Sequence, residues 1–353
     1  MAVVKGDGYG HGATAVGRAA LRAGASELAV ATVGEGAELR TVGITAPILV
    51  LSAIDPEEVG TALSFGLELT VGTEELFQAV AVAADAGGRR DQVGVHVKVD
   101  SGMRRYGARP DLAVALAERV ANHRGLSLAG FSTHFAAADE PGLSATEDQT
   151  AIFDQALANL AERGVRPTVV HAANSAATIH SRRYHYGMVR VGIALYGLPP
   201  SAEIQLLPGM KPVMSLGSRV TRVVRLDPGD KVGYGRTYRA ATEEHAVVVP
   251  VGYADGYPRA LSNVGWMAIG RGRCPVIGRV SMDQTVIRIP EDLDVQVGTE
   301  VSVFGGGSEQ EPTVQELARL VGTIPYEIVT QLTRRLPRQY LGGGEGYVHT
   351  EPG

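Results

Sequence analysis

The sequence predicts an α/β protein in which a (β/α)₈ barrel is followed by a mainly β C-terminal domain. Up to about residue 208, short apolar runs alternate with segments whose apolar residues recur at helical spacing. Beyond that point, valine-rich runs are separated by turn sequences. A chain of 353 residues is also longer than a single small domain usually is. We therefore expect a barrel over residues 1–208 and a β domain over residues 209–353.

Eight apolar runs in the first part have the length and composition of buried strands. They are AVVK (2–5), ELAVAT (27–32), PILVLS (47–52), LELTV (67–71), VGVHVKV (93–99), LAGFSTHF (128–135), TVVHA (168–172) and MVRVGIA (188–194). Helical patterns such as ATAVGRAALRAG and TEELFQAVAVAADAG lie between them and often end in glycine. Alternating strands and helices form right-handed parallel units, and eight units in about 200 residues match the (β/α)₈ barrel.

The second part begins with MKPVMSLGSRVTRVVRL (210–226), where apolar and polar residues alternate in places. This alternation is typical of strands with one buried face. The segments DPGD (227–230) and GRGR (270–273) have the composition of turns. Only TVQELARLVG (313–322) and PYEIVTQLTRRL (325–336) have helical spacing there, so we expect a β domain with two helices near its end.

Composition and charge exclude several classes of protein. The chain is 44% hydrophobic and 20% charged, with a net charge of −5 and no block of like charges, so no nucleic-acid partner is expected. No run reaches the ~18 apolar residues that span a membrane. Lys5 interrupts the first apolar run before it could act as a signal peptide, which favours a cytoplasmic protein. The single cysteine, Cys274, has apolar neighbours and is expected to be a buried structural thiol.

Polar residues follow several of the predicted strands, at the face of a barrel where active sites form. Lys5 ends the first strand, and the fifth to eighth strands lead into VKVDSGMRR, STHFAAADE, HAANSAA and MVRVGIALYG. His134 and His171 lie in no metal-binding spacing, so no metal is expected. The turn GDGYGHG also lacks the dinucleotide-binding pattern. Taken alone, Lys5 is either a solvated strand end or a nucleophilic amine, but the set suits an anionic ligand with a carbonyl group.

Eight motifs in order resemble those of the alanine racemase family. They are AVVKGDGYGHG, VKVDSGMRRYG, STHFAAADE, HAANSAA, MVRVGIALYG, VGYGRTY, VGYADGYPR and GRVSMDQ, and the resemblance extends from residue 1 to about residue 340. This family consists of pyridoxal 5′-phosphate (PLP) enzymes with a barrel and a C-terminal β domain. The resemblance implies a homodimeric isomerase that interconverts L-alanine and D-alanine by a two-base mechanism and supplies D-alanine for peptidoglycan.

The resemblance also implies roles for residues that hold the cofactor. Lys5 matches the lysine that forms the covalent imine with PLP and then acts as one of the two acid–base groups. A free lysine is a poor base at neutral pH, so burial and neighbouring cations must lower its pKa. Tyr9 matches a tyrosine that contacts the phosphate, together with Ser175 and the backbone of Gly192 and Ile193.

Arg190 matches the arginine that faces the pyridine nitrogen, and His134 would lie behind it and orient it. Many PLP enzymes place a carboxylate at this nitrogen, which keeps it protonated and makes the ring a strong electron sink. An arginine can only donate to an unprotonated nitrogen. The family assignment therefore implies that side reactions such as transamination are limited.

Tyr234 matches the second acid–base residue, which the β domain of a partner subunit supplies. Racemisation removes a proton on one face of the α-carbon and delivers one on the other, so two groups are needed. Tyr253, Met282 and Asp283 match residues near the substrate entrance or carboxylate, again from the partner. The resemblance thus implies active sites shared between two chains.

Arg105 matches an arginine near the cofactor hydroxyl and the substrate carboxylate, and Lys98 matches a lysine that can be carbamylated to hold that arginine. The sequence departs from the family in three places. Arg104 stands where a glycine is common, and Arg334 stands about where some members have a phosphate-contacting tyrosine. The strand and helix that normally precede the first barrel strand are also missing, so we expect either a truncated chain or an internal start.

Two alternatives remain on sequence grounds. One is a related PLP enzyme of the same architecture, such as a serine or broad-specificity amino-acid racemase or an amino-acid decarboxylase. Decarboxylases of this type pair the ring nitrogen with an acidic residue, so Arg190 disfavours them. The other is a catalytically impaired homologue that binds PLP, which the presence of both Lys5 and Tyr234 disfavours.

Overall fold

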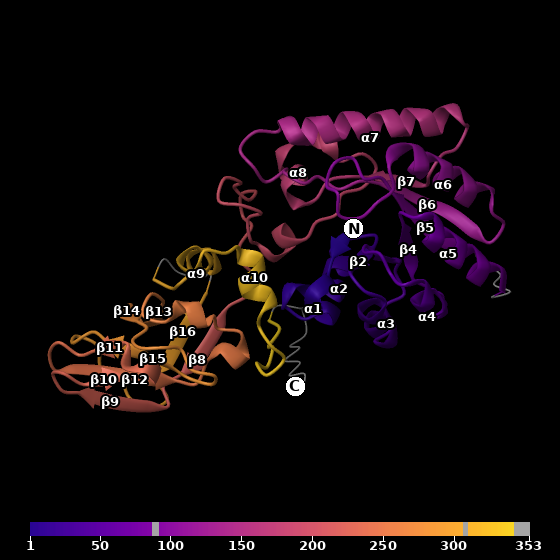
Figure 1. The fold of residues 1–353 in the computed structure, drawn as a ribbon. Helices are drawn as coiled ribbons and strands as arrows, with labels where there is room; N and C mark the ends of the chain where they lie inside the picture. Colours follow the sequence, from indigo (N-terminus) through magenta and orange to yellow (C-terminus); the bar gives the residue numbers. More distant parts are fainter. Residues whose placement is uncertain (87–91, 306–309, 342–353) are drawn as a thin grey trace. The chain divides into compact units, whose positions relative to one another are not determined.

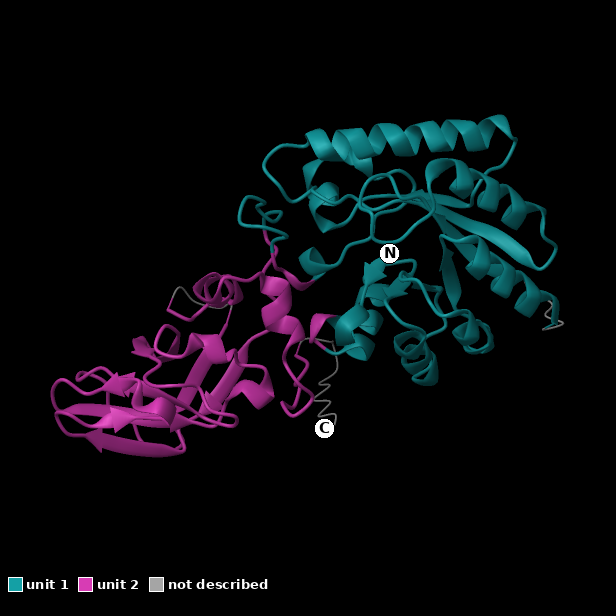
Figure 2. Ribbon diagram, in the orientation of Figure 1, with its two compact units in different colours: residues 1–8, 12–195, 199–208 teal, residues 9–11, 196–198, 209–353 magenta. Residues whose placement is uncertain are grey.

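The computed structural model describes residues 1–86, 92–305 and 310–341, which divide into two compact units (Figure 2). Unit 1 comprises residues 1–8, 12–195 and 199–208. Unit 2 comprises residues 9–11, 196–198 and the chain from residue 209 onward. Two short segments, 9–11 and 196–198, thus belong with the C-terminal unit although they lie in the N-terminal part of the sequence.

Unit 1 contains a parallel sheet whose strands follow one another in sequence order (Figure 1). The strands are β1 (Ala2–Val3), β2 (Leu28–Val30), β3 (Ile48–Val50), β4 (Glu68–Val71), β5 (Val93–Lys98), β6 (Leu126–Ser132) and β7 (Val169–His171). The eighth predicted segment pairs only through two isolated parallel bridges, His171↔Met188 and Ala2↔Val191, because the chain then enters a 3₁₀ helix at Ile193–Tyr196. These bridges join β7 to β1 and close the sheet, so the barrel prediction is confirmed.

Helices follow most of the strands and cover the outer surface of the sheet. They are α2 (Ala13–Arg22), α3 (Val33–Thr41), α4 (Val59–Ser64), α5 (Glu74–Ala86), α6 (Pro110–Asn122), α7 (Ser144–Glu162) and α8 (Ser175–His180). Figure 1 shows α5, α6 and α7 alongside the later strands. Valine, leucine and alanine side chains from strands and helices form one continuous core between the two layers. The barrel is therefore held from outside by apolar packing.

Helix α3 is an element without a clear periodic signal, because Gly34 and Gly36 interrupt its apolar pattern. Its start is fixed instead by a capping box. The Thr32 hydroxyl accepts from the Glu35 backbone N–H at 3.3 Å, and the Glu35 carboxylate accepts from the Thr32 N–H at 3.2 Å. Reciprocal bonds of this kind satisfy N–H groups that the first helical turn leaves unpaired.

Unit 2 is mainly antiparallel, as expected for the β domain. Its strands are β8 (Leu216–Arg219), β9 (Arg222–Leu226), β10 (Lys231–Val232), β11 (Tyr238–Arg239), β12 (Glu244–Val249), β13 (Trp266–Ile269), β14 (Gly272–Pro275), β15 (Thr285–Ile289) and β16 (Glu300–Phe304). They form sheets ordered β15-β12-β9 and β14-β13-β16-β8, and a β10-β11 ribbon. Cys274 on β14 is fully buried, as predicted, and burial raises the pKa of its thiol to about 11.

The two predicted C-terminal helices are present as α9 (Val314–Val321) and α10 (Pro325–Thr330). Helix α10 ends earlier than the pattern over 325–336 predicts. The Arg338 guanidinium donates to the carbonyl oxygens of Leu332 and Leu336, at 3.0 and 2.7 Å, and so takes acceptors that a longer helix would need. Over the described ranges, no helix has the length and apolar character needed to cross a membrane.

Candidate active site

Lys5 lies at the end of β1, where the chain enters a left-handed turn. Gly6, Asp7 and Gly8 have φ angles of 62°, 52° and 60°. This conformation costs a non-glycine residue such as Asp7 roughly 1–2 kcal/mol. Two carboxylates hold the turn: Glu35 accepts from the Gly6 N–H at 2.6 Å, and Asp7 accepts from the Ala13 N–H at 3.0 Å. The position of Lys5 is therefore fixed by a strained turn bonded to the start of α3.

Burial lowers the pKa of the Lys5 amine, and the positive charge of Arg105 lowers it further. Glu35 acts in the opposite direction, because a nearby carboxylate favours the protonated amine. The net direction agrees with the expectation from the sequence. A larger fraction of the Lys5 amine is therefore unprotonated at neutral pH than for an exposed lysine.

Arg190 is buried, with 5% of its surface exposed, and its guanidinium is bonded on two sides. Nη2 donates to the carbonyl oxygens of Thr133 and Ala172, both at 2.8 Å, and to Nδ1 of His134 at 3.1 Å. Nη1 donates to Nδ1 of His171 at 2.7 Å. All four acceptors are uncharged when the imidazoles are neutral. Burial lowers the pKa of Arg190 to about 10, so the guanidinium stays charged at neutral pH.

The two histidines that contact Arg190 are held in their neutral form. Burial lowers the pKa of both His134 and His171 well below the usual histidine value, and the Arg190 charge lowers each pKa further. A neutral imidazole has one nitrogen free to accept a hydrogen bond. Sequence reasoning placed His134 behind Arg190 but assigned no such contact to His171. Of the two hydrogen bonds between Arg190 and a histidine, the one to His171 is the shorter.

Lys98, the last residue of β5, belongs to the same cluster of cations. Burial lowers the pKa of its amine to about 7, with further lowering by Arg190, Arg105 and Lys5 and opposition from Asp100. Its Nζ atom lies 5.5 Å from the centre of the Tyr106 ring. The structure therefore brings together Lys5, Lys98, Arg105, His134 and Arg190, all of which sequence reasoning selected.

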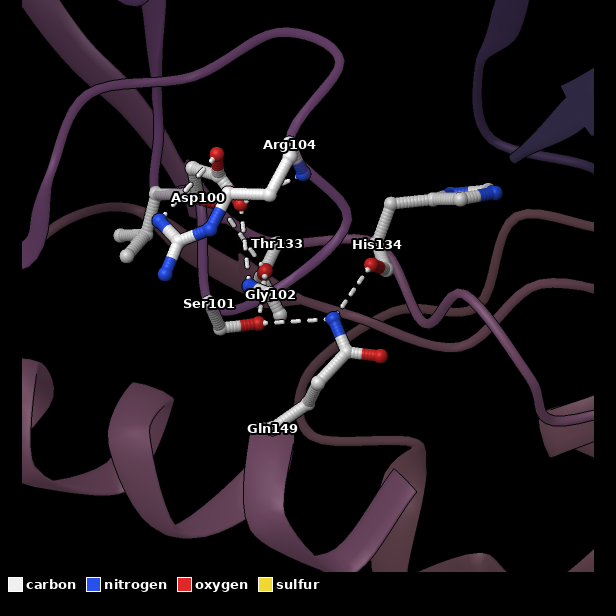
Figure 3. Close-up of polar contacts among 8 residues, drawn as sticks. Asp100, Ser101, Gly102, Arg104, Thr133, His134 and Gln149 are labelled. Atoms are coloured by element: carbon white, nitrogen blue, oxygen red, sulfur yellow. Dashed lines mark hydrogen bonds and ion pairs between the residues drawn. The ribbon is translucent and has the colours of Figure 1, made fainter. Parts of the chain in front are cut away.

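The two neighbouring arginines after β5 are both exposed but interact with different groups. Figure 3 shows the side chain of Arg104 beside Asp100, and its guanidinium is 3.7 Å from that carboxylate. Arg104 has a φ of 58°, which explains why glycine is favoured here, and its side chain is 71% exposed. Arg105 is the arginine whose charge lowers the pKa values of Lys5, Lys98 and His134.

Gln149 on α7 is a positioning residue that sequence reasoning missed. Its amide nitrogen donates to the Ser101 hydroxyl at 3.2 Å and to the His134 carbonyl at 3.1 Å (Figure 3). Its amide oxygen accepts from the Ala136 N–H at 2.8 Å. Gln149 thus ties the segment after β5 to the segment after β6. The sequence did contain a signal for Gln149, because this polar residue falls on the buried face of the amphipathic helix α7.

Ser175, the first residue of α8, lies beside the segment that bridges β7 and β1. Its hydroxyl oxygen accepts from the backbone N–H groups of Gly192 at 3.0 Å and Ala194 at 3.3 Å. Ile193, between them, is buried. Asn174 caps α8 by accepting from the Ala177 N–H at 3.0 Å. The structure therefore brings Ser175, Gly192 and Ile193 together, as the sequence motifs predicted.

Tyr9 belongs to unit 2, where it packs among other aromatic residues. Its ring centre is 4.9 Å from that of Tyr196 and 6.1 Å from that of Tyr326. Burial raises the pKa of the Tyr9 hydroxyl to about 12. Tyr326, on α10, was not selected from the sequence, where attention fell on Arg334 instead. Tyr326 is thus a second aromatic neighbour of Tyr9, farther from it than Tyr196.

Four further predicted residues lie in loop segments of unit 2, where Tyr234 and Tyr253 each begin a three-residue 3₁₀ helix. Tyr234, Tyr253 and Met282 are exposed, with 72%, 43% and 52% of their surface accessible. Backbone bonds join two of these loops: Tyr253 N–H donates to the Ser281 carbonyl at 3.0 Å. Asp283 pairs with Arg335 at 2.8 Å. The loops are thus well bonded through their backbones, whereas all four side chains are exposed.

Comparison with known proteins agrees with this arrangement. The family model for the alanine racemase N-terminal domain matches residues 1–200, and that for the C-terminal domain matches residues 213–340. The alanine racemase of Symbiobacterium thermophilum is 46% identical over 98% of this chain and 90% of its own length. That of Desulforamulus reducens is 44% identical over 97% of this chain and 92% of its own length.

Solved structures give the same result. The alanine racemase of D-cycloserine-producing Streptomyces lavendulae superposes with a TM-score of 0.92 at 37% identity, over 99% of this chain and 92% of that one. The Bacillus anthracis enzyme with bound L-Ala-P superposes with a TM-score of 0.90 at 38% identity, over 98% and 89%. With both domains matched and these identities across nearly the full length, the chain belongs to the alanine racemase family.

Proposed function

We propose that this protein is an isomerase that interconverts L-alanine and D-alanine with PLP as its cofactor, and that it supplies D-alanine for peptidoglycan in the cytoplasm. The main supporting observation is the cluster at the carboxyl ends of the barrel strands. There, Lys5 has a lowered pKa, and the buried Arg190 is bonded, among the described residues, to carbonyl oxygens and neutral imidazoles; the charges of both residues lower the pKa of Lys98. The high identity to alanine racemases supports alanine as substrate.

The residues present fit PLP. Lys5 supplies an amine that is more readily unprotonated than usual, as imine formation with an aldehyde requires. Arg190 supplies a donor for the pyridine nitrogen, and none of its acceptors among the described residues is a carboxylate. Tyr9, Ser175, Gly192 and Ile193 would hold the phosphate. When bound, PLP delocalises the electrons left on the α-carbon after its proton is removed.

The proton transfers are assigned to Lys5 and Tyr234. Lys5 would accept or return the α-proton on one face of the substrate, and Tyr234 of a second chain would do so on the other face. Arg105, Tyr253, Met282 and Asp283 would bind the substrate carboxylate or line its entrance. The exposure of Tyr234, Tyr253 and Met282 supports the assignment of these side chains to a homodimer with shared sites.

Lys98 is proposed to be carbamylated. Its pKa of about 7 leaves much of the amine unprotonated at neutral pH, and only that form reacts with carbon dioxide. A carbamate would place a negative charge among Lys5, Arg105 and Arg190, whose positive charges all act on Lys98. Carbon-13 NMR of protein supplied with labelled bicarbonate should show one carbamate signal, which is absent in Lys98→Met.

The direct test is to incubate the purified protein with L-alanine and D-alanine separately and to follow optical rotation. Each enantiomer should convert to an equal mixture, and the protein should be yellow. Borohydride reduction followed by peptide mapping should label Lys5. Labelling of another lysine would contradict the cofactor assignment. Conversion of serine but not alanine would identify a related racemase, and a yellow but inactive protein would identify an impaired homologue.

A further inference from the structure

A line of hydrogen-bonded side chains runs across the barrel interior and ends at Arg190. The Arg190 guanidinium is 2.7 Å from Nδ1 of His171. Nε2 of His171 is 2.9 Å from Nδ1 of His96, and Nε2 of His96 is 2.9 Å from a carboxylate oxygen of Glu68. Arg190, His171 and His96 are buried, whereas the Glu68 side chain is 25% exposed. We call these four residues the Glu68–Arg190 line.

The line begins near the amino ends of the strands and reaches their carboxyl ends. Glu68 is the first residue of β4, His96 lies in the second half of β5, and His171 is the last residue of β7. Side chains alternate across a strand, so His96 faces the same side of the sheet as Lys98. The line therefore joins Arg190, in the candidate site, to a carboxylate at the opposite end of the barrel.

Two glycines on neighbouring strands make room for this line. A Cβ atom on Gly130 of β6 would lie 2.1 Å from Nδ1 of His96, and one on Gly94 of β5 would lie 2.9 Å from Cγ of Glu68. Neither glycine has a positive φ, so backbone conformation does not require glycine at either position. The space for the His96 ring and the Glu68 stem is what requires it.

The order of donors along the line follows from chemistry. A guanidinium only donates, so Nδ1 of His171 must accept, and the proton of this neutral ring lies on Nε2. That proton is donated to Nδ1 of His96, which in turn must hold its own proton on Nε2 and donate it to Glu68. Each contact is then one hydrogen bond. Moving either ring proton to Nδ1 would place two donors, or two acceptors, opposite each other.

We propose that Glu68 and His96 are positioning residues for Arg190: the Glu68 carboxylate fixes the ring protons of His96 and His171 so that His171 presents a lone pair to the guanidinium. The inference rests on the proposed function only in taking Arg190 as the group that faces the cofactor ring. Within the described part of the chain, no carboxylate is hydrogen-bonded directly to Arg190, and Glu68 acts at a distance through two oriented imidazoles. Glu68 and Arg190 select the same order of donors from the two ends of the line, so loss of the Glu68 charge should let a fraction of the rings reverse and leave Arg190 less well held.

The first test replaces Glu68 with glutamine, which has nearly the same shape. A glutamine amide can either accept or donate, so it no longer selects one position for the His96 proton. Two-bond nitrogen–proton spectra of the full chain labelled with ¹⁵N-histidine should show His96 and His171 each protonated on Nε2. In Glu68→Gln, only Arg190 still selects the order of donors, so a fraction of both rings should carry the proton on Nδ1, with Arg190 displaced from His171.

The matched control is Glu27→Gln. The Glu27 carboxylate interacts electrostatically with Glu68 and His96, but one of its oxygens is buried without a hydrogen-bond partner and it lies outside the line. This variant removes the same charge nearby and should leave both tautomers unchanged. The proposal is overturned if wild-type His171 has its proton on Nδ1, if Glu68→Gln leaves the tautomers unchanged, or if Glu27→Gln alters them equally.

The second test displaces His96 without changing a polar group. Gly130→Ala should push the His96 ring out of the line and lower kcat for alanine about tenfold, with KM changed less than about twofold. Glu68→Gln should give a similar loss. In a His96→Ala background the clash is gone, so Gly130→Ala should add no further loss. Additive losses would overturn the proposal.

These readouts separate failure of the inference from failure of the proposed function. A wild-type protein without racemase activity would refute the function, but the tautomer spectra would still decide whether Glu68 fixes the two rings. Active protein with unchanged spectra and kinetics in Glu68→Gln would refute the inference alone. The melting temperature of each variant should be measured in parallel, so that loss of the fold is recognised.

Discussion

The barrel mouth of unit 1 and the exposed loops of unit 2 contain the two halves of the predicted site, and they are built differently. Arg190 is 5% exposed, and its guanidinium is bonded to side chains and carbonyl groups of its own unit. Tyr234, by contrast, is 72% exposed, and Met282 is 52% exposed. The barrel half is organised by bonds within its own unit, whereas the side chains of the other half are exposed.

The loops of unit 2 are nevertheless fixed at the level of the backbone. A Cβ atom on Gly252 would lie 2.3 Å from the Met282 carbonyl oxygen, and one on Gly256 would lie 2.3 Å from the Gln331 carbonyl oxygen. Close backbone approach therefore requires glycine at both positions. A predicted site residue can thus lie on a well-bonded loop backbone while its side chain is exposed.

The largest expected effect comes from separating the two halves. Lys5→Ala and Tyr234→Phe should each lower racemase activity on the order of a thousandfold or more. A mixture of the two variants should regain activity, because each mixed dimer has one intact site and one site with both defects. Random exchange would restore about a quarter of wild-type activity, since about half the dimers are mixed and half of their sites are intact.

The control for this experiment mixes Lys5→Ala with a chain that has both substitutions, which should restore nothing. Subunit exchange should be shown independently, for example with two differently tagged chains. If exchange is complete and activity does not return, Tyr234 acts within its own chain or not at all. Light scattering that shows a fully active monomer would lead to the same conclusion.

Arg190→Glu tests the barrel half alone. A carboxylate would keep the pyridine nitrogen protonated, so racemisation should slow about a hundredfold while transamination rises. Optical rotation measures the first rate and pyruvate release the second. Arg190→Lys is the control, because it retains the positive charge but loses the paired donors. Unchanged rates in Arg190→Glu would show that this side chain does not face the cofactor ring.

The pH dependence of the unfolding free energy tests how strongly the cluster of cations desolvates Lys98. Its folded-state pKa is about 7, below the unfolded value of ~10.4, so the folded state binds fewer protons between these values. The free energy of unfolding should therefore increase by about 2 kcal/mol or more as the pH is raised across that window. The same gain should be lost when the pH is lowered to about 7. Urea denaturation in buffer free of carbon dioxide should detect this rise.

Lys98→Met should lack the rise in unfolding free energy. The matched control is Lys231→Met on β10, which removes the same charge from an exposed position outside the cluster. If Lys98→Met and wild type respond equally to pH, the lysine is not held as a desolvated amine. The same result is expected when Lys98 is fully carbamylated, so the mass of the protein should be checked in the same samples.

The smallest effect is expected at the turn that leads into Arg105. Arg104→Gly removes a side chain from a residue with a φ of 58° and should stabilise the fold by roughly 0.5 kcal/mol, after loss of its solvent-exposed ion pair. Activity should change less than about twofold. Arg105→Gly should instead weaken alanine binding. Equal losses in the two variants would show that both arginines face the site.

Periodicity and strand-end chemistry were enough to predict the barrel, the β domain and the charged group at the barrel mouth. They missed α3, whose pattern Gly34 and Gly36 interrupt and whose start depends on a capping box. They also overextended α10, because the carbonyl groups that follow it are bonded to the side chain of Arg338, a few residues further along the chain. Both differences arise from local bonds that apolar spacing does not reveal.

Two residues of the Glu68–Arg190 line stand out in the sequence, although the sequence analysis gave them no role. His96 in VGVHVKV and Glu68 in LELTV are polar residues within apolar runs, which is unusual for a buried strand. Their partners lie on other strands, at sequence separations of 28 and 75 residues. Only the closed sheet brings them together. The chemistry of single residues can thus be read from the sequence, whereas a network across strands requires the register of the sheet.

The buried thiol of Cys274 makes the chain convenient for site-specific labelling. It is the single cysteine of the sequence, it is fully buried, and its raised pKa of about 11 disfavours the reactive thiolate. A cysteine introduced at an exposed position such as Val297, which is 65% accessible, would therefore be the one thiol open to a maleimide dye. A donor and an acceptor dye on separate chains would then report association by energy transfer, without removal of the native cysteine.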